Sequence, residues 1–220
     1  MKLGLLLGVI AMFIPSYLRA QEDSTASKEV KREVFVTGGI SYPYLPEQLN
    51  ANYKPGYNIG AGNSIIFPPG TLGYSKVSFV LEYSTFKFDQ PGYFKSFTHD
   101  DSLILINNPG LVATQRPAKI FTAMVDYQGI FTVTDVVAPY FLIGAGFFYV
   151  SVPPLITTPT TTLEQAPYNH ATIAWTFGLG VDVSISDDFG AFVQGKSVLG
   201  VLNDTHQLFP ISAGVRYTLP

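Results

Sequence analysis

Residues 172–184 alternate strictly between two kinds of side chain. The odd positions carry large apolar groups, among them Trp175, Phe177 and Leu179, whereas the even positions carry small or hydroxyl-bearing residues and one carboxylate, Asp182. Because successive side chains of a strand point to opposite faces, this pattern predicts one β-strand with an apolar face and a small, polar face. A strand of a water-soluble sheet usually carries lysine and glutamate on its polar face. The small polar face therefore favours lipid outside and a crowded barrel interior inside.

The alternation recurs in six further segments, and a seventh, residues 139–152, is predicted to be a strand that is apolar on both faces. The eight predicted strands cover residues 33–42, 57–67, 76–86, 119–132, 139–152, 172–184, 189–198 and 211–219. The long connections cover residues 43–56, 90–117, 153–170 and 200–209, and short turns lie between them. An up-and-down barrel with all its long loops at one end has this rhythm. We predict an all-β fold, an eight-stranded antiparallel up-and-down transmembrane β-barrel, with a secreted soluble barrel or sandwich as the alternative.

The segment at residues 139–152 is apolar on both faces, so its orientation does not follow from alternation alone. Gly144 and Gly146 suit the crowded interior. We therefore expect the even positions to point inward and the odd positions to point outward. The inward positions then include Tyr140, Leu142, Phe148 and Val150.

Outward aromatic residues fall near both ends of the predicted strands. The set near the loop ends is Tyr57, Tyr83, Tyr149 and Trp175, and the set near the turn ends is Phe67, Tyr127 and Tyr217. Amphipathic rings prefer the two interfaces of a bilayer, so these residues are candidates for an aromatic girdle. The general preference of aromatic residues for strands is the alternative explanation, but it accounts for their number and not for their positions.

The N-terminus has the features of a secretory leader. Lys2 precedes an apolar run at residues 3–14, and Ala20 offers a small residue at the cleavage position. We predict a signal peptide at residues 1–20, a flexible lead-in at 21–32 and the barrel domain at 33–220. No later apolar run approaches the length of a membrane helix, so we expect any membrane insertion to use strands.

The amino-acid composition argues against several classes of partner and site. Charged residues make up 13% of the chain and the formal net charge is −3. Loss of Lys2 and Arg19 with the leader leaves 11 basic against 16 acidic residues, which argues against a nucleic-acid partner. The absence of cysteine excludes disulfides, thiolate metal sites and cysteine nucleophiles.

The leader, the eight amphipathic strands and the closing FPISAGVRYTL sequence at residues 209–219 resemble the small outer-membrane barrels of the OmpA/OmpX type. The resemblance covers about residues 33–219. It implies a monomeric, porin-like barrel in the outer membrane of a Gram-negative cell, inserted by the barrel-assembly machinery and in contact with the lipid bilayer and lipopolysaccharide. Such barrels commonly end in an aromatic residue that the assembly machinery reads. This chain ends in Leu219 and Pro220, which leaves that role to Tyr217.

Charged residues also occupy inward positions. The predicted lumen cluster consists of Glu82, Asp126, Asp182, Lys196 and Arg216. Side chains fill the interior of an eight-stranded barrel, and buried charges there must pair because an isolated one is costly to desolvate. We therefore expect a salt-bridged plug that fixes the strand register and leaves no permanent pore. A proton or ion pathway, or a gate that opens by exchanging pairs, is the functional alternative.

Catalytic motifs are not evident. The sequence has no Gly-x-Ser-x-Gly elbow and no His-Glu-x-x-His zinc motif, and we expect His99, His170 and His206 to be solvated loop residues. We predict no enzyme activity, no catalytic residue, no metal site and no cofactor; a barrel that modifies lipid A is the enzymatic alternative.

The expected role is envelope structure or surface interaction through the four outer loops. A narrow channel or carrier for small apolar molecules, as in OmpW-type barrels, is the runner-up, and the apolar inner face of residues 139–152 supports it. Residues 102–106 could extend a hairpin, fold inward as a lid or meet a partner, and residues 157–162 are expected to be mobile or to mask the surface.

Overall fold

The structure, a computed structural model, describes residues 31–45, 47–68, 73–97, 104–161, 163–201 and 205–219. The predicted signal peptide at residues 1–20 and residues 21–30 of the predicted lead-in lie outside this described part. The first strand begins at Lys31, so the last two residues of the expected lead-in belong to the barrel wall.

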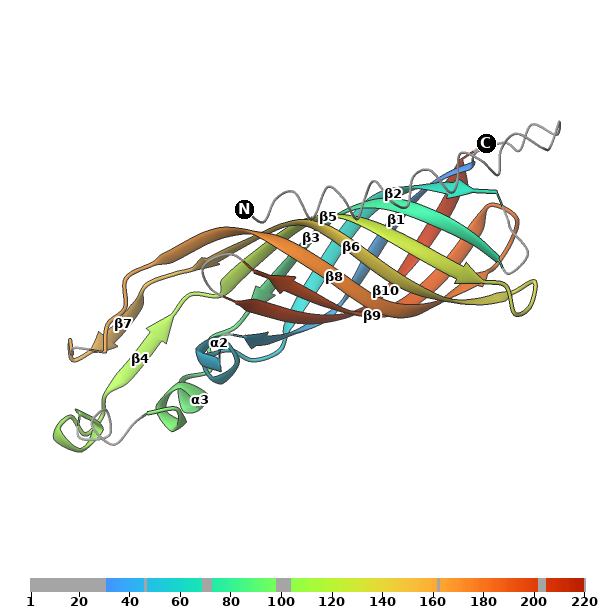
Figure 1. Ribbon diagram of the computed structural model, residues 1–220. Helices are drawn as coiled ribbons and strands as arrows, with labels where there is room; N and C mark the ends of the chain where they lie inside the picture. Colours follow the sequence, from blue (N-terminus) through green and yellow to red (C-terminus); the bar gives the residue numbers. More distant parts are fainter. Residues whose placement is uncertain are drawn as a thin grey trace, which may run out of the picture.

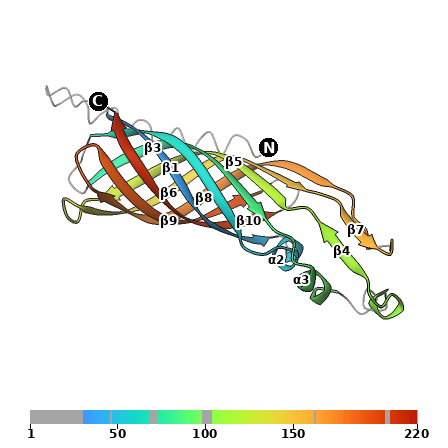
Figure 2. The same cartoon turned by 180° about the vertical axis from the view of Figure 1, so that it is seen from behind.

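Eight long strands close into one barrel (Figures 1 and 2). They are β1 (Lys31–Leu45), β2 (Gly56–Phe67), β3 (Gly73–Phe86), β5 (Ala118–Phe131), β6 (Val137–Val152), β8 (Tyr168–Ser184), β9 (Phe189–Gly200) and β10 (His206–Leu219). Every pair is antiparallel, each barrel strand pairs with the next one along the chain, and β1 pairs with β10 to close the wall. The predicted all-β, eight-stranded antiparallel up-and-down barrel is confirmed.

Several strands run further than their alternation indicated. β8 begins at Tyr168 and β10 at His206, where the sequence pattern placed the first strand residues at 172 and 211. Tyr168 pairs with Val152, and His206 pairs with Gly200. Residues expected in loops thus continue the ladder because their backbone groups find partners on a neighbouring strand that is equally long.

Four shorter elements gather at one end of the barrel, which we call the loop end (Figure 1). They are α2 (Glu47–Asn52), α3 (Gln90–Lys95), β4 (Val112–Gln115) and β7 (Leu155–Thr158). β4 and β7 form a separate antiparallel two-stranded sheet. The opposite end, the turn end, carries the connections at residues 132–136 and 185–188.

The expectations for two loop segments need correction. Residues 102 and 103 lie outside the described residues, and residues 104–107 form a helical turn, so the hairpin extension is built by β4 and β7 instead. Thr157 and Thr158 belong to β7, and the buried Thr157 hydroxyl lies 3.1 Å from that of Thr161. These threonines therefore have a defined place in the loop-end structure, whereas residue 162 is not described.

In the part of the chain that the structure describes, no helix is both long enough and apolar enough to span a membrane.

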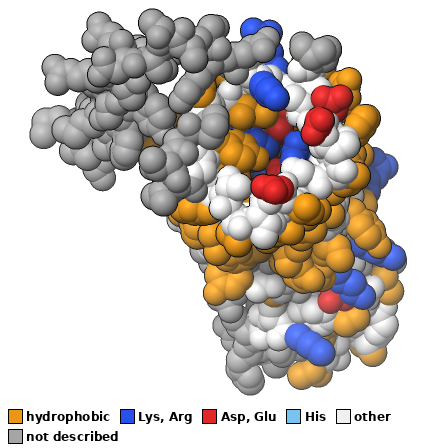
Figure 3. Space-filling model, turned by 90° about the vertical axis from the view of Figure 1, so that its right-hand side faces the viewer, with side chains coloured by type: hydrophobic (Ala, Val, Ile, Leu, Met, Phe, Trp, Pro, Cys, Tyr) orange, Lys and Arg blue, Asp and Glu red, His pale blue; other side chains and the backbone are white. Residues whose placement is uncertain are grey.

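Large apolar side chains cover the outside of the barrel, and the inside holds the charged and many polar side chains together with apolar clusters. Phe177 and Leu179 are 55% and 70% exposed, whereas Thr176 and Asp182 on the opposite face of β8 are buried. The orientation predicted for residues 139–152 is confirmed, since Tyr140, Leu142, Phe148 and Val150 are all buried. Figure 3 views the molecule from the turn end and shows charged side chains within the opening and hydrophobic side chains around the wall.

Candidate functional site

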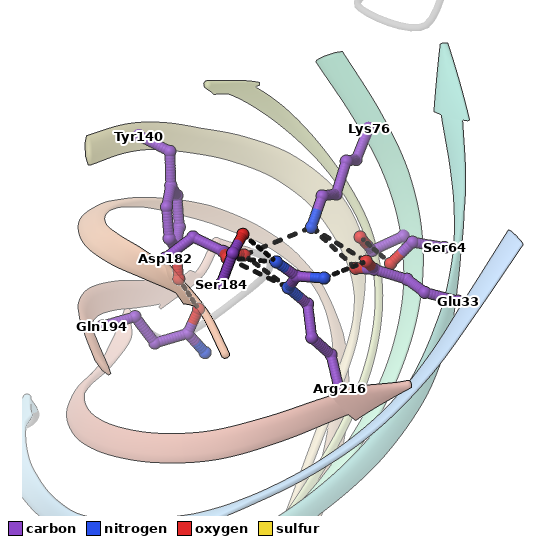
Figure 4. A network of polar contacts seen from close by, with 9 residues as sticks. Glu33, Ser64, Lys76, Tyr140, Asp182, Ser184, Gln194 and Arg216 are labelled. Carbon is purple, nitrogen blue, oxygen red and sulfur yellow. Dashed lines mark hydrogen bonds and ion pairs between the residues drawn. The ribbon is translucent and has the colours of Figure 1, made fainter. Parts of the chain in front are cut away.

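The turn-end half of the interior holds a four-residue ionic group from four different strands: Glu33, Lys76, Asp182 and Arg216 (Figure 4). Lys76 Nζ donates to Glu33 Oε1 at 2.9 Å and to Asp182 Oδ2 at 3.3 Å. Arg216 donates from Nε to both Asp182 oxygens at 3.0 Å and from Nη2 to Oδ1 at 2.7 Å. Two cations therefore balance two carboxylates, and the side chains join β1, β3, β8 and β10 across the barrel axis.

A second ionic group lies nearer the middle of the barrel and is less well satisfied. Lys196 Nζ lies 2.8 Å from Glu82 Oε2, although the angles at this ion pair are not those of a hydrogen bond. Asp126 is also buried here, and its Oδ1 has no hydrogen-bond partner among the described residues. One cation thus faces two carboxylates, which leaves the described interior with more acidic than basic groups.

A small cavity of about 20 Å³ separates the two ionic groups. Its lining includes Lys76, Asp126, Asp182, Tyr140 and Gln194. The Tyr140 hydroxyl donates to Gln194 Oε1 at 3.1 Å on the wall of this cavity. The space is large enough for about one water molecule and not for a continuous column of water.

The loop-end half of the interior holds a large apolar cluster beside a buried polar network, in which Ser41, Asn58, Ser84 and Ser212 are hydrogen-bonded. Its buried cluster includes Phe86, Ala118, Ile120, Met124, Phe148, Val150, Ala174, Val198 and Leu208. Leu49 of α2 and the adjoining Tyr53 belong to the same cluster, so this short helix covers the loop end of the lumen. Burial raises the pKa of the Tyr53 hydroxyl, which stays protonated and donates to Gln115 Oε1 at 2.6 Å.

Beyond this cover, the loop end has a small core of its own. Tyr93 of α3, Ala113 of β4 and Leu155 of β7 are buried against one another, and Phe94 and Phe97 pack on them. Tyr93 and Phe97 meet edge to face at 4.9 Å between ring centroids. The opposite face of the β4–β7 sheet, which includes Val112 and Ile156, is exposed.

The histidine expectation was wrong for two of the three residues. His206 is the first residue of β10 and is 3% exposed, and His170 lies in β8 and is partly buried. The His206 ring stacks on Phe148 with 5.8 Å between centroids and lies 5.9 Å from the His170 ring. Their place in strands follows from the longer β8 and β10. His99 lies outside the described residues.

All five lumen residues predicted from the sequence are buried in the barrel interior: Glu82, Asp126, Asp182, Lys196 and Arg216. The structure joins Asp182 to Arg216 and Glu82 to Lys196. The sequence reading missed Glu33 and Lys76, which stood at the first positions of two predicted strands. Their parity would have revealed them, because Glu33 shares a face with Thr37 and Lys76 shares one with Ser78.

The candidate girdle residues lie at two levels, with one exception. Tyr57, Tyr83 and Tyr149 are exposed within four residues of the loop-side ends of β2, β3 and β6. Phe67, Tyr127 and Tyr217 are partly exposed near the turn-side ends of their strands. Trp175 is also partly exposed, but it lies seven residues into β8 because that strand begins at Tyr168.

The turn-end level gains members that the sequence reading did not select. Phe189 packs on Tyr217 with 4.8 Å between ring centroids, and Phe141 contacts both Tyr127 and Phe131. In the described part of the chain, no three histidine, aspartate or glutamate side chains are placed to share a metal ion.

The arrangement of strands matches solved barrels closely enough to compare. Neisserial surface protein A aligns with 86% of this chain and 96% of its own, at 12% identity and a TM-score of 0.50. The fold is that of the small eight-stranded outer-membrane barrels. This confirms the fold that the OmpA/OmpX resemblance implied.

Two further solved structures align over most of the chain. Ail, the attachment invasion locus protein of Yersinia pestis, aligns with 87% of this chain and 99% of its own, at 11% identity and a TM-score of 0.49. The N-terminal β-barrel domain of Pseudomonas aeruginosa OprF aligns with 87% of this chain and 100% of its own, at 10% identity and a TM-score of 0.41. No protein-family model and no curated protein matches the sequence.

Proposed function

We propose that this chain is a monomeric, non-enzymatic barrel of a Gram-negative outer membrane that acts in envelope structure or surface interaction through its loop end. The observation that carries the proposal is the inverted distribution of side chains. Ile59, Leu179 and Val193 are more than half exposed on the outer wall, while Lys76, Lys196 and Arg216 are buried within. This distribution suits a barrel surrounded by acyl chains and would be unfavourable in water.

The loop end supports a role in surface interaction. α2 covers the lumen and the β4–β7 sheet stands on a separate aromatic core, so the loop segments carry an ordered structure beyond the wall. Binding residues are commonly placed on loops that a rigid scaffold positions. Lipopolysaccharide is the expected lipid on this side of the membrane, and the barrel-assembly machinery is the expected partner during insertion.

Cell fractionation with gel mobility measured before and after boiling tests the proposal. We expect the mature chain in the outer-membrane fraction, released only by detergent, with faster migration before boiling because a folded barrel stays compact. Recovery in the aqueous phase without detergent would support the soluble barrel instead.

A narrow channel or carrier for small apolar molecules is the second candidate, favoured by the apolar cluster in the loop-end half of the lumen. Entry would require α2 to move, because Leu49 and Tyr53 are buried over that cluster. Uptake of an apolar dye into proteoliposomes separates the two functions. If the protein acts only through its surface, proteoliposomes should take up the dye no faster than liposomes without protein.

The alternative that the protein is a lipid-modifying enzyme can be tested by replacing His170 and His206, whose rings lie close together. His170→Ala and His206→Ala barrels, compared with the parent in cells, are expected to leave the mass spectrum of lipid A unchanged. A mass difference that disappears with either substitution would establish an enzymatic role.

A further inference from the structure

A continuous hollow crosses the outer wall of the barrel. Its outward residues follow the hydrogen-bonding direction from strand to strand, as the register shows: Phe121, Tyr83, Ile59, Gly38, Ala213, Val193 and Val181. The next outward row includes Leu81, Ala61, Val36, Val215, Ala191 and Val183. Both rows line one open groove of about 1020 Å³, which we call the wall groove.

Small residues create the wall groove. Gly38, Ala61, Ala191 and Ala213 occupy outward positions where the flanking residues are large. Val36 and Ile59 lie in the same two rows, are 55% and 66% exposed, and project beyond the small residues next to them. A glycine or alanine between such neighbours leaves room for a narrow apolar group against the backbone.

The wall groove runs obliquely from the loop end to the turn end. It begins near the loop-side ends of β3 and β5, at Tyr83 and Phe121, and finishes at Val181 and Val183 near the turn-side end of β8. Six strand spacings of about 4.8 Å give a path of roughly 29 Å. One leaflet of a bilayer has a hydrocarbon depth of about 15 Å. Because the groove is oblique, its path is longer than the depth it covers, so an acyl chain from the loop side would follow it from Phe121 to beyond Gly38.

Two lysines stand at the loop-side end of the wall groove. Lys119 is the next outward position beyond Phe121 on β5, and Lys87 follows the end of β3 four residues beyond Tyr83. Both side chains are exposed, and neither ammonium group lies within ion-pair distance of a carboxylate among the described residues. Lys119 pairs with Thr85, which places the ends of β3 and β5 side by side.

We propose that the wall groove seats one acyl chain of an anionic, phosphate-bearing lipid of the loop-side leaflet, with Lys87 and Lys119 holding its headgroup. The inference rests on the proposed function, because only a membrane barrel presents this wall to lipid. The positive charge at one end and the apolar floor below match the two parts of such a lipid. The outward rows of the wall groove carry no carboxylate, so a second copy of this wall would leave the two lysines without a partner and would complement this end less well than a lipid phosphate.

Spin-labelled lipids in vesicles of phosphatidylcholine with the full chain reconstituted test the proposal. Phosphatidylglycerol labelled on its acyl chain is expected to be held at the barrel about tenfold or more in preference to labelled phosphatidylcholine, given two interfacial lysines. The double variant Lys87→Gln/Lys119→Gln is expected to abolish this preference. Equal immobilisation of the two labels by the parent would overturn the proposal.

Gly38→Leu and Gly195→Leu form a matched pair of variants for the groove itself. Both glycines are exposed on the outer wall, and a Cβ would meet the Asn58 carbonyl oxygen at an ordinary 3.6 Å at Gly38 and nothing within 4 Å at Gly195, but only Gly38 lines the wall groove. We expect Gly38→Leu to reduce the immobilised phosphatidylglycerol several-fold and Gly195→Leu to leave it unchanged. Ala61→Leu, which fills the same groove from β2, is the second test should Gly38→Leu fail to fold.

Gel mobility before and after boiling, measured on the same samples, separates the two proposals. A folded, inserted barrel whose lipid preference depends on the lysines but not on Gly38 or Ala61 would overturn the wall groove and leave the proposed function standing. A change in cross-linked oligomer without a change in lipid immobilisation would assign the groove to a second copy. A chain that fails to insert would overturn both proposals.

Discussion

Two aspartates face the same interior but meet different surroundings. Asp182 accepts hydrogen bonds from the Arg216 guanidinium and from Lys76, whereas Asp126 Oδ1 has no partner among the described residues. A buried carboxylate stabilises a fold only when its charge and its lone pairs are both satisfied. The two residues therefore differ in energetic role, although their sequence positions look alike.

This difference predicts that replacing aspartate with asparagine has different effects on stability at the two positions. Asp182→Asn should cost about 3–5 kcal/mol, because it leaves two buried cations facing Glu33 alone. Asp126→Asn should fall within about 1 kcal/mol of the parent or be more stable, since it removes an uncompensated charge. Urea unfolding in vesicles measures both, with Trp175, the single tryptophan, as the fluorescence reporter. Equal destabilisation by the two variants would contradict the assignment.

Glycines in the wall give a second residue-scale prediction. A Cβ at the inward Gly144 would lie 2.4 Å from the Val125 carbonyl oxygen, whereas one at the outward Gly195 would meet nothing within 4 Å. Gly144→Ala should therefore destabilise the barrel by about 1–3 kcal/mol through overpacking, and Gly195→Ala should be close to neutral. The same urea titration provides the measurement. A neutral Gly144→Ala would show that the interior is looser than the structure indicates.

At the scale of elements, strict alternation carried the prediction of the barrel. Residues 172–184 could be predicted as a strand because large apolar side chains and small or polar ones alternate at every position. The charged residues of the lumen could then be predicted from their odd or even positions along each strand. Glu33 and Lys76, at the first positions of two predicted strands, were missed. Alternation in residue type ceases to be informative where a strand extends to the loop end of the barrel. The first residues of β8 are mostly exposed on both faces, whereas the inward positions at the start of β10 include the apolar Leu208 and Pro210, so neither stretch shows the pattern.

The loop-end elements could not be predicted from local pattern. β4 and β7 have four residues each, and they are strands because they pair with each other across more than 30 residues of sequence. α3 is held in place by Tyr93, which packs on Ala113 of β4 and on Leu155 of β7. Such short elements depend on tertiary contacts that periodicity does not encode.

Neighbouring residues of β4 therefore provide a test at this scale. Ala113 is buried against α3, and Thr114 is exposed on the opposite face. Ala113→Arg should separate β4 from β7 and make the loop end sensitive to limited proteolysis, while Thr114→Arg should not. Both variants should keep the urea midpoint of the parent barrel, because the wall pairs without β4 and β7. Loss of barrel stability in Ala113→Arg alone would show that the two parts fold as one unit.

For the molecule as a whole, an ionic group and an apolar cluster block the interior, one after the other along the barrel axis. The turn-end half is closed by the ionic group around Arg216, and the loop-end half by the apolar cluster around Phe148 under α2. An ion crossing the barrel would have to disrupt the first and leave water for the second, and both steps are costly. Either layer alone should therefore stop conduction.

This arrangement predicts how conductance responds to substitutions in each layer. In planar bilayers we expect the parent chain, the ionic-layer variant Lys76→Ser/Arg216→Ser and the apolar-layer variant Met124→Ser/Phe148→Ser all to stay at the baseline of protein-free membranes. The combined variant should conduct, because it widens and hydrates both halves at once. Mobility before boiling verifies that each variant is folded. A conducting ionic-layer variant would show that the apolar half is no barrier, and the narrow channel would then become the better account of this protein.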